Sequence, residues 1–496
     1  MLEKTHGNLL GHKSVVLGQK QTAVKFRMFC KEDNVQSVLA SELSPVLSSI
    51  RTHEGEIEFA GKVTAKLLVD EQNGAVGGMS YTADISDVFS SPLIFDDSIV
   101  TATLTVLDSA MEVDGAEVTV NAVVGAEFTL FEPIQKEYLE QSNLQCRNQE
   151  VRLGQVVANV DEVFSVVDEM EIKDDIARVL STQSNVIINS AVSGDKVLTV
   201  SGEVVLNLVY IPTNQDLPKS VLLPFEFTQE VPCSGNGVAL LDAIVKATKI
   251  HLEVLEEQKT SVFSVDVVTA LKGVVVADNT QSLVVDCFST TNALTTQNAS
   301  IDTTLAKGVF LKTATIEGNV EFESAEKQDY YGVFGWAVTV LSATAKEDGV
   351  EVSGIISGDL LFGKDKLNSM RVEIPFQNTV TEIDASVGDT VEVFGVVRQA
   401  QAEFLDGVIG IDAQIALSIK LSETVSATFV SDVTEGGSLE DNFGAIEVSL
   451  AFKGDSLWDI AKSLNMSVED ILKLNPQLTD PLEQDEKLLV YHRRTA

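Results

Sequence analysis

Hydrophobic and polar residues alternate with a period of two along much of the chain. The alternation is clearest in residues 117–123, 265–271 and 409–417. A period of two places successive side chains on opposite faces of a strand, so it is typical of sheets with one packed face and one face nearer water. Valine and threonine are abundant and tryptophan is rare, which also favours strands over helices. We therefore predict a mostly β protein built from antiparallel sheets.

One pattern occurs three times: a small residue, then a glycine, then a strand of mostly apolar residues. The copies span residues 60–69, 201–210 and 353–362, with glycines at Gly61, Gly202 and Gly354. A turn containing glycine and an acidic residue precedes each copy, as expected for a β-hairpin, because these residues tolerate a positive φ. We predict three related antiparallel β-rich repeat domains at residues 1–150, 151–290 and 291–435.

Two segments carry an apolar spacing that predicts helices instead. Residues 32–50 place four side chains near one helical face: Val35, Val38, Leu39 and Leu43. Pro45 is expected to interrupt that helix. Residues 161–183 place four more in a similar stripe: Ile172, Ile176, Val179 and Leu180. Residues 434–443 are polar and contain glycine, which predicts a linker.

The final segment, residues 443–493, follows a different pattern. Apolar runs at 446–453 and 487–491 flank two short helical stripes, and the first stripe consists of Leu457, Ile460, Ala461 and Leu464. Asp455 or Ser456 is expected to cap the first helix. The second helix is expected to begin after Ser467 and to end before Pro476, because the residue preceding proline is pushed out of the α region. We predict a small α+β module with the order strand–helix–helix–strand.

This segment resembles the LysM family, a βααβ module carried by many bacterial wall proteins. The resemblance rests on Gly454-Asp455-Ser456-Leu457, Ile460-Ala461, Asn475-Pro476 and Leu478, at the spacing of that family. It implies a groove for N-acetylglucosamine chains between two loops, formed by Gly454, Asp455, Ser456 and Leu457 on one side and Asn475, Pro476, Gln477 and Leu478 on the other. The same residues also cap and terminate helices, so a purely structural role stays open.

The module departs from the sugar-binding pattern in both strands. Ser449 and Ala451 stand where the family usually has an aromatic residue, and residues 485–487 replace the usual glycine before the last strand. These changes leave the groove open to a protein ligand as an alternative to a sugar. Trp458 lies off the apolar stripe, so we expect it either to anchor an interface or to pack against Lys462 or the second helix.

Repeated β domains followed by one LysM-like module resemble the SPOCS-domain spore-coat proteins of endospore-forming Firmicutes. The resemblance implies a protein made in the mother-cell cytoplasm and placed at the forespore surface, within the spore coat. It also implies that the LysM-like module contacts a coat-basement protein, an ATPase of the SpoIVA kind. Peptidoglycan fragments and self-association stay open as alternatives for the partner.

The charge and the cysteine content limit the partners and the cellular compartment that we expect for this protein. The chain has 35 Lys and Arg against 74 Asp and Glu, a formal charge of −39. Nucleic acid and anionic membranes draw on clustered cations, so both are disfavoured as partners. The four cysteines lie far apart without a CxxC pair, which predicts neither a disulfide framework nor a zinc site and favours a reducing cytosol. We also expect no signal peptide and no membrane insertion.

The sequence contains no recognisable catalytic motif. The five histidines are scattered and no GxSxG or HExxH motif accompanies them. The GxxxxGK match at 358–364 is followed by Asp365, where a phosphate loop needs Ser or Thr for Mg²⁺. We therefore expect no enzyme activity, no cofactor and no metal. The favoured hypothesis is a scaffold that binds proteins; the alternative is a cell-wall or cortex protein that binds peptidoglycan or N-acetylglucosamine.

Overall fold

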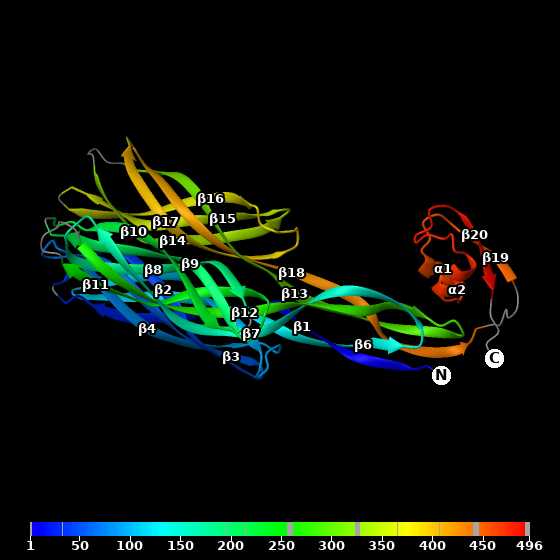
Figure 1. Cartoon of the computed structure of the whole chain (residues 1–496). Helices are drawn as coiled ribbons and strands as arrows, with labels where there is room; N and C mark the ends of the chain where they lie inside the picture. The colour runs from blue at the N-terminus through cyan, green and yellow to red at the C-terminus, as the bar shows by residue number, and fades with distance from the viewer. Residues whose placement is uncertain are drawn as a thin grey trace.

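The computed structural model describes residues 2–491 except 32, 195, 214, 255–260, 323–327, 365, 406 and 440–445. Within these residues the chain is mostly β, and its two short helices lie near the C-terminus (Figure 1). The sequence-based prediction of fold class is confirmed. All of the strand pairs are antiparallel.

The first β unit consists of six strands: β1 (Lys4–Phe29), β2 (Val35–His53), β3 (Glu56–Glu71), β4 (Val76–Ser90), β5 (Ile99–Asp114) and β6 (Glu117–Ser142). They form two three-stranded sheets, ordered β1-β6-β5 and β2-β3-β4. The first, sixth and fifth strands thus make one sheet, while the second, third and fourth make the other.

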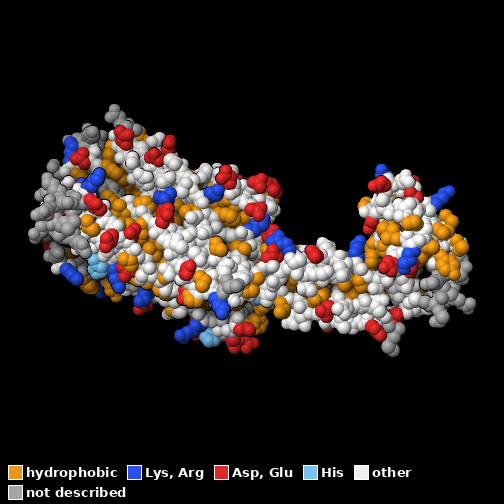
Figure 2. All heavy atoms as spheres, in the orientation of Figure 1, with side chains coloured by type: hydrophobic (Ala, Val, Ile, Leu, Met, Phe, Trp, Pro, Cys, Tyr) orange, Lys and Arg blue, Asp and Glu red, His pale blue; other side chains and the backbone are white. Residues whose placement is uncertain are grey.

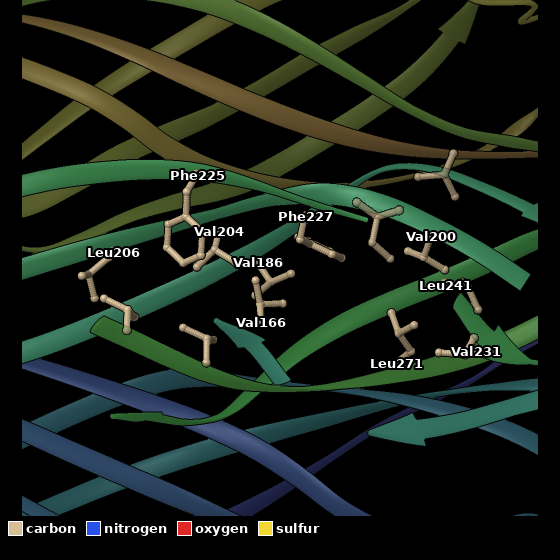
Figure 3. Close-up of a cluster of buried hydrophobic side chains, with 14 of the residues drawn as sticks. Val166, Val186, Val200, Val204, Leu206, Phe225, Phe227, Val231, Leu241 and Leu271 are labelled. Atoms are coloured by element: carbon tan, nitrogen blue, oxygen red, sulfur yellow. The ribbon is translucent and has the colours of Figure 1, made fainter. Parts of the chain in front are cut away.

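The second β unit repeats this order with β7 (Gln145–Ile172), β8 (Ile176–Ser193), β9 (Val197–Pro212), β10 (Lys219–Pro232), β11 (Val238–Val254) and β12 (Ser261–Phe288). A single pairing between β8 and β11, Val192 with Val238, joins its two sheets into one. Val204, Leu206 and Phe225 from β9 and β10 lie in its core (Figure 3). Opposing side chains from β7, β8 and β12 complete the cluster, so each unit buries apolar surface between its own sheets.

The third β unit has the same order again in β13 (Asn292–Glu321), β14 (Asp329–Lys346), β15 (Gly349–Gly363), β16 (Leu367–Thr381), β17 (Thr390–Leu405) and β18 (Val408–Ser438). Strand β18 extends to Ser438, so the first residues of the predicted linker 434–443 belong to a sheet; residues 440–443 lie outside the described residues.

The repeated glycines have a steric cause. Gly61, Gly202 and Gly354 occupy equivalent places on β3, β9 and β15. A Cβ atom at these positions would lie only 2.7, 2.3 and 2.5 Å from the carbonyl oxygens of the preceding strand, those of Val46, Ile187 and Thr339. Carbonyl oxygens in a ladder cannot move aside cheaply. The small-residue–glycine step is therefore required by the close approach of two strands.

The two predicted helices are wrong. Residues 35–53 form β2, and residues 161–183 divide between β7 and β8. β2 and β8 each contain three register shifts against the next strand. A bulge inserts one extra residue, which changes the spacing of inward-facing positions from two to three and imitates a helical stripe. Pro45 does not interrupt β2, which is an edge strand that tolerates a missing N–H group.

The three units are tied together by polar contacts as well as apolar packing. The Arg398 guanidinium donates to both carboxylate oxygens of Glu203, at 2.7 and 2.5 Å, which joins the second and third units. Lys66 donates to the carbonyl of Thr182 at 2.5 Å, which joins the first and second. Strands β2, β5, β8, β11, β14 and β17 surround a cavity of about 850 Å³ between the units. The β units thus make one body around a shared centre.

The longest strands of the three units, β1, β6, β7, β12, β13 and β18, extend together beyond the rest of the sheets. We call this extension the arm, and the C-terminal module lies at its end (Figure 1). The module consists of β19 (Ile446–Ala451), α1 (Leu457–Ser463), α2 (Val468–Leu474) and β20 (Glu486–Tyr491). The strand–helix–helix–strand prediction is confirmed. The module has its own apolar core, to which Phe288 of β12 also belongs.

Candidate binding module and its seat on the arm

Helix α1 begins where the sequence predicts. Ser456 is its N-cap, and its hydroxyl accepts the backbone N–H of Asp459 at 3.1 Å. Leu457, Ile460 and Ala461 are buried on one face. Asp455, the alternative cap, instead accepts the backbone N–H of Phe452 at 2.8 Å. The carboxylate of Asp455 therefore shapes the turn that leads into the helix.

Helix α2 ends at Leu474, and the side chain of its C-cap residue, Asn475, ties the helix to the last strand. Its amide nitrogen donates to the carbonyls of Ile471 and Leu489, both at 2.9 Å, and its oxygen accepts the Leu489 N–H at 2.7 Å. Only 3% of Asn475 is exposed. A buried amide with these partners stabilises the fold, because each partner would otherwise be a buried polar group without a hydrogen bond.

The loop between β19 and α1 uses its backbone groups within the module. Gly454 has a φ of +93° and donates its N–H to the carbonyl of Leu482 at 2.9 Å. The N–H of Leu457 donates to the carboxylate of Asp480 at 3.0 Å. The positive φ explains the glycine, since other residues are strained there. These N–H groups are occupied and do not offer free donors to an acetamide.

The remaining predicted groove residues differ in exposure. Pro476 and Gln477 are exposed, whereas Leu478 is partly buried and packs on the module's core. Leu457 is only 5% exposed, in the same core. The structure thus brings the two loops into one small module but leaves Gly454, Pro476 and Gln477 as its accessible parts. A binding role for Gly454, Asp455, Ser456, Leu457, Asn475, Pro476, Gln477 and Leu478 stays a prediction.

Trp458 lies in the contact between the module and the arm. Its indole N–H donates to the carboxylate of Asp286 at 2.8 Å. Its ring meets that of Phe288 edge-on, with centroids 5.1 Å apart at 66°. The guanidinium of Arg147 lies 5.9 Å from the indole centroid. Within this structure Trp458 therefore anchors an intramolecular contact, which we call the seat: Arg147, Asp286, Phe288, Trp458 and Lys462.

Lys462 completes the seat by pairing with the same carboxylate. Its ammonium lies 2.7 and 2.8 Å from the two oxygens of Asp286. Burial raises the pKa of Asp286, but the hydrogen bonds from Lys462 and Trp458 outweigh it and hold that pKa below its ordinary value. Asp286 is therefore ionised while the module is seated. Neither Asp286 nor Phe288 could be predicted from the sequence, because both lie far from the module along the chain.

The outward-facing surface of the β19–β20 sheet is apolar. Six side chains form this outer face, between 41% and 71% exposed: Ile446, Val448, Leu450, Phe452, Leu489 and Tyr491. The pairing of Val448 with Leu489 and of Ile446 with Tyr491 places them on one side of the sheet. Figure 2 shows hydrophobic side chains gathered on the side of the module where Figure 1 places these strands. Apolar clusters of this kind mark interaction sites.

Within the described residues, the structure contains neither a metal-binding cluster nor a membrane-spanning helix. Among the described residues no group of three or more His, Cys, Asp or Glu side chains is arranged to hold a metal ion. None of the helices in the described part of the chain has the length and apolarity needed to cross a bilayer.

Comparison with known proteins identifies the module alone. Residues 453–482 match the LysM domain family. A search of curated proteins and a search of solved structures each found no match. The match covers both helices of the module and the loops flanking them, and it does not extend to the three β units. LysM domains bind carbohydrates such as peptidoglycan, or proteins.

Proposed function

We propose that the chain is a non-enzymatic adaptor of the spore coat, similar to the SPOCS-domain protein SipL. Its LysM module binds a coat-basement ATPase of the SpoIVA kind, and its β units present surfaces to other coat proteins. The protein works in the mother-cell cytoplasm, at the forespore surface. The match of residues 453–482 to the LysM family supports the binding role of the module.

The outer face is the observation that favours a protein partner over a sugar. It is an exposed apolar surface, and Lys487 pairs with Leu450 across the sheet. Sugars need several hydrogen-bonding groups around the ring, whereas protein interfaces have apolar centres. The backbone N–H groups of Gly454 and Leu457, at the β19–α1 loop, are occupied within the module. A protein surface with matching apolar residues therefore fits the module better than a glycan chain.

A charge placed on the outer face tests the proposal. Val448→Asp in the full chain should weaken binding of the purified SpoIVA-like ATPase by tenfold or more in calorimetry, about 1.4 kcal/mol, because a carboxylate would be desolvated at the contact. Val16→Asp is the matched control. Val16 in β1 and Val448 in β19 are 62% and 61% exposed, and both lie within strands. Wild-type affinity for Val448→Asp would refute the outer face as the binding surface.

The alternative function is binding of peptidoglycan or N-acetylglucosamine. The family match and the accessible Gly454, Pro476 and Gln477 favour it. Titration of chitooligosaccharides into the full chain separates the two proposals. Saturable binding that Gln477→Ala weakens and Val448→Asp leaves unchanged would support the glycan function. Absence of heat with the sugar, together with saturable binding of the ATPase, would support the adaptor.

A further inference from the structure

Two cysteines face each other at the end of the arm. Cys146 on β7 and Cys287 on β12 are direct partners across an antiparallel ladder. Directly opposed residues in such a ladder have Cα atoms about 4.5–5.5 Å apart, within the range of about 4.4–6.8 Å that a disulfide spans. Both cysteines belong to one small apolar cluster, and both are free thiols. The register therefore places the two cysteines at a backbone separation that a disulfide can span.

The pair is chemically asymmetric. The Cys287 thiol donates toward Cys146, and this contact, with help from the Ser142 hydroxyl at 3.2 Å, lowers the pKa of Cys146 despite its partial burial. The same contact raises the pKa of Cys287, which is only 2% exposed. The thiolate is the reactive form of cysteine. Cys146, the more accessible of the two, is therefore the nucleophile, and Cys287 is placed to resolve what forms on it.

We propose that Cys146 and Cys287 are a redox-sensitive dithiol that closes to a disulfide between β7 and β12 when a peroxide reaches the end of the arm. The inference is independent of the proposed adaptor function. Reaction with hydrogen peroxide proceeds in two steps. The Cys146 thiolate attacks one peroxide oxygen, the O–O bond breaks, and hydroxide leaves, which gives a sulfenic acid at Cys146.

In the second step the Cys287 sulfur attacks the sulfur of Cys146. An S–S bond forms, the S–O bond breaks, and the departing hydroxide takes the Cys287 proton to become water. Two cysteines have then lost two electrons and two protons, and one peroxide has become two waters. Cys30 and Cys233 lie in other parts of the fold, on neither β7 nor β12, and provide an internal comparison.

The position of the pair links it to the seat. Arg147 follows Cys146, while Asp286 and Phe288 flank Cys287. Side chains alternate between the faces of a strand, so the strand pair carries the dithiol on one face and the module's contacts on the other. A disulfide here would join the two strands directly beneath the LysM module. The ends of β7 and β12 would then no longer separate.

The experiment uses the full chain, treated with hydrogen peroxide and analysed by mass spectrometry under non-reducing conditions. We expect a loss of two hydrogens and one cross-linked peptide joining residues 146 and 287. Cys287→Ser should stop the reaction at the sulfenic acid, so dimedone should label Cys146. Cys146→Ser should abolish both products. The matched control, a Cys30→Ser/Cys233→Ser double variant, should form the disulfide at the wild-type rate.

Three results would overturn the proposal: no cross-linked peptide, cross-links that involve Cys30 or Cys233, or dimedone labelling of Cys287→Ser at Cys30 or Cys233 alone. The pH profile of iodoacetamide alkylation gives a second readout that does not depend on the variants folding. In wild-type protein the midpoint at Cys146 should lie well below the value of about 8.5 that an ordinary cysteine shows. An ordinary midpoint would contradict the assignment of Cys146 as the nucleophile.

Discussion

Removing one carboxylate should release the LysM module from the arm. Asp286→Ala deletes the acceptor of the Trp458 indole and the partner of Lys462. The hydrogen bond to a charged group contributes about 1.5–3 kcal/mol. The ion pair adds at most about 1 kcal/mol, because the Lys462 side chain is 45% exposed. The edge-on contact with Phe288 and the Arg147 contact remain and together supply about 1–2.5 kcal/mol. The burial of Phe288, which is 5% exposed in the module's core, remains as well.

These magnitudes make the seat sensitive to Asp286. A loss of about 1.5–4 kcal/mol lowers the ratio of seated to released module by roughly 10- to 700-fold. The contacts that remain must then oppose, without the carboxylate, the freedom that the module gains on release. We therefore expect a larger fraction of released module in Asp286→Ala than in the wild-type chain at neutral pH.

Tryptophan fluorescence is a direct assay, because the chain has only two tryptophans. Trp336 is 5% exposed inside the third β unit and serves as a constant background. Release of the module exposes Trp458, so Asp286→Ala should shift the emission to the red and increase quenching by acrylamide. Asp278→Ala is the matched control, since it removes another ion-paired carboxylate of β12, the partner of Arg152. Wild-type emission from Asp286→Ala would refute the reasoning.

Acid should have the same effect in the wild-type chain. The pKa of Asp286 is lower in the seated state than its ordinary value of about 3.9. A lowered pKa stabilises the seated state fully above the ordinary value, and that stability is lost as the pH falls through the seated pKa. Trp458 emission should therefore shift to the red below pH about 4, reversibly, and this transition should be missing in Asp286→Ala. Emission that stays constant down to acid unfolding would contradict the role of this carboxylate.

Two further substitutions test the origins of the fold. Gly202→Ala should lower the free energy of unfolding of the β units in urea by about 1–3 kcal/mol, because the added Cβ would meet the Ile187 carbonyl and the Phe227 ring. Gly437→Ala is the control and should leave the stability unchanged, because Gly437 has open space around it. Asn475→Ala should cost the module about 2–4 kcal/mol by leaving its partners unpaired. Hydrogen exchange at the Leu489 amide should report that loss, and the exposed Gln477→Ala should not change it.

Local patterns predicted the parts of the fold that depend on local chemistry. Alternation identified the strands, and the recurrence of Gly61, Gly202 and Gly354 reflected one steric requirement met three times. The N-cap and the apolar stripe of α1 could be predicted because they depend only on residues that are close together in the sequence. Bulges in β2 and β8 defeated the same reasoning, because an extra residue in a strand imitates helical spacing.

Contacts between distant parts of the chain could not be predicted from the sequence. Nothing near Trp458 indicates that its partners are Asp286 and Phe288, since a tryptophan beside an apolar stripe suits several surroundings equally. The facing of Cys146 and Cys287 likewise depends on the register of β7 against β12, which widely spaced cysteines do not reveal. In the module, sequence similarity located the loops, but only the hydrogen bonds show that the N–H groups of Gly454 and Leu457 are occupied.

Binding of the purified SpoIVA-like ATPase to the full chain, and to a chain lacking residues 443–496, tests the adaptor proposal most directly. Both are measured by calorimetry at equal salt, with circular dichroism to verify that the shortened chain keeps its strands. We expect saturable binding to the full chain and none to the shortened one. Equal affinity for both chains would contradict the proposal that this protein acts through its LysM module.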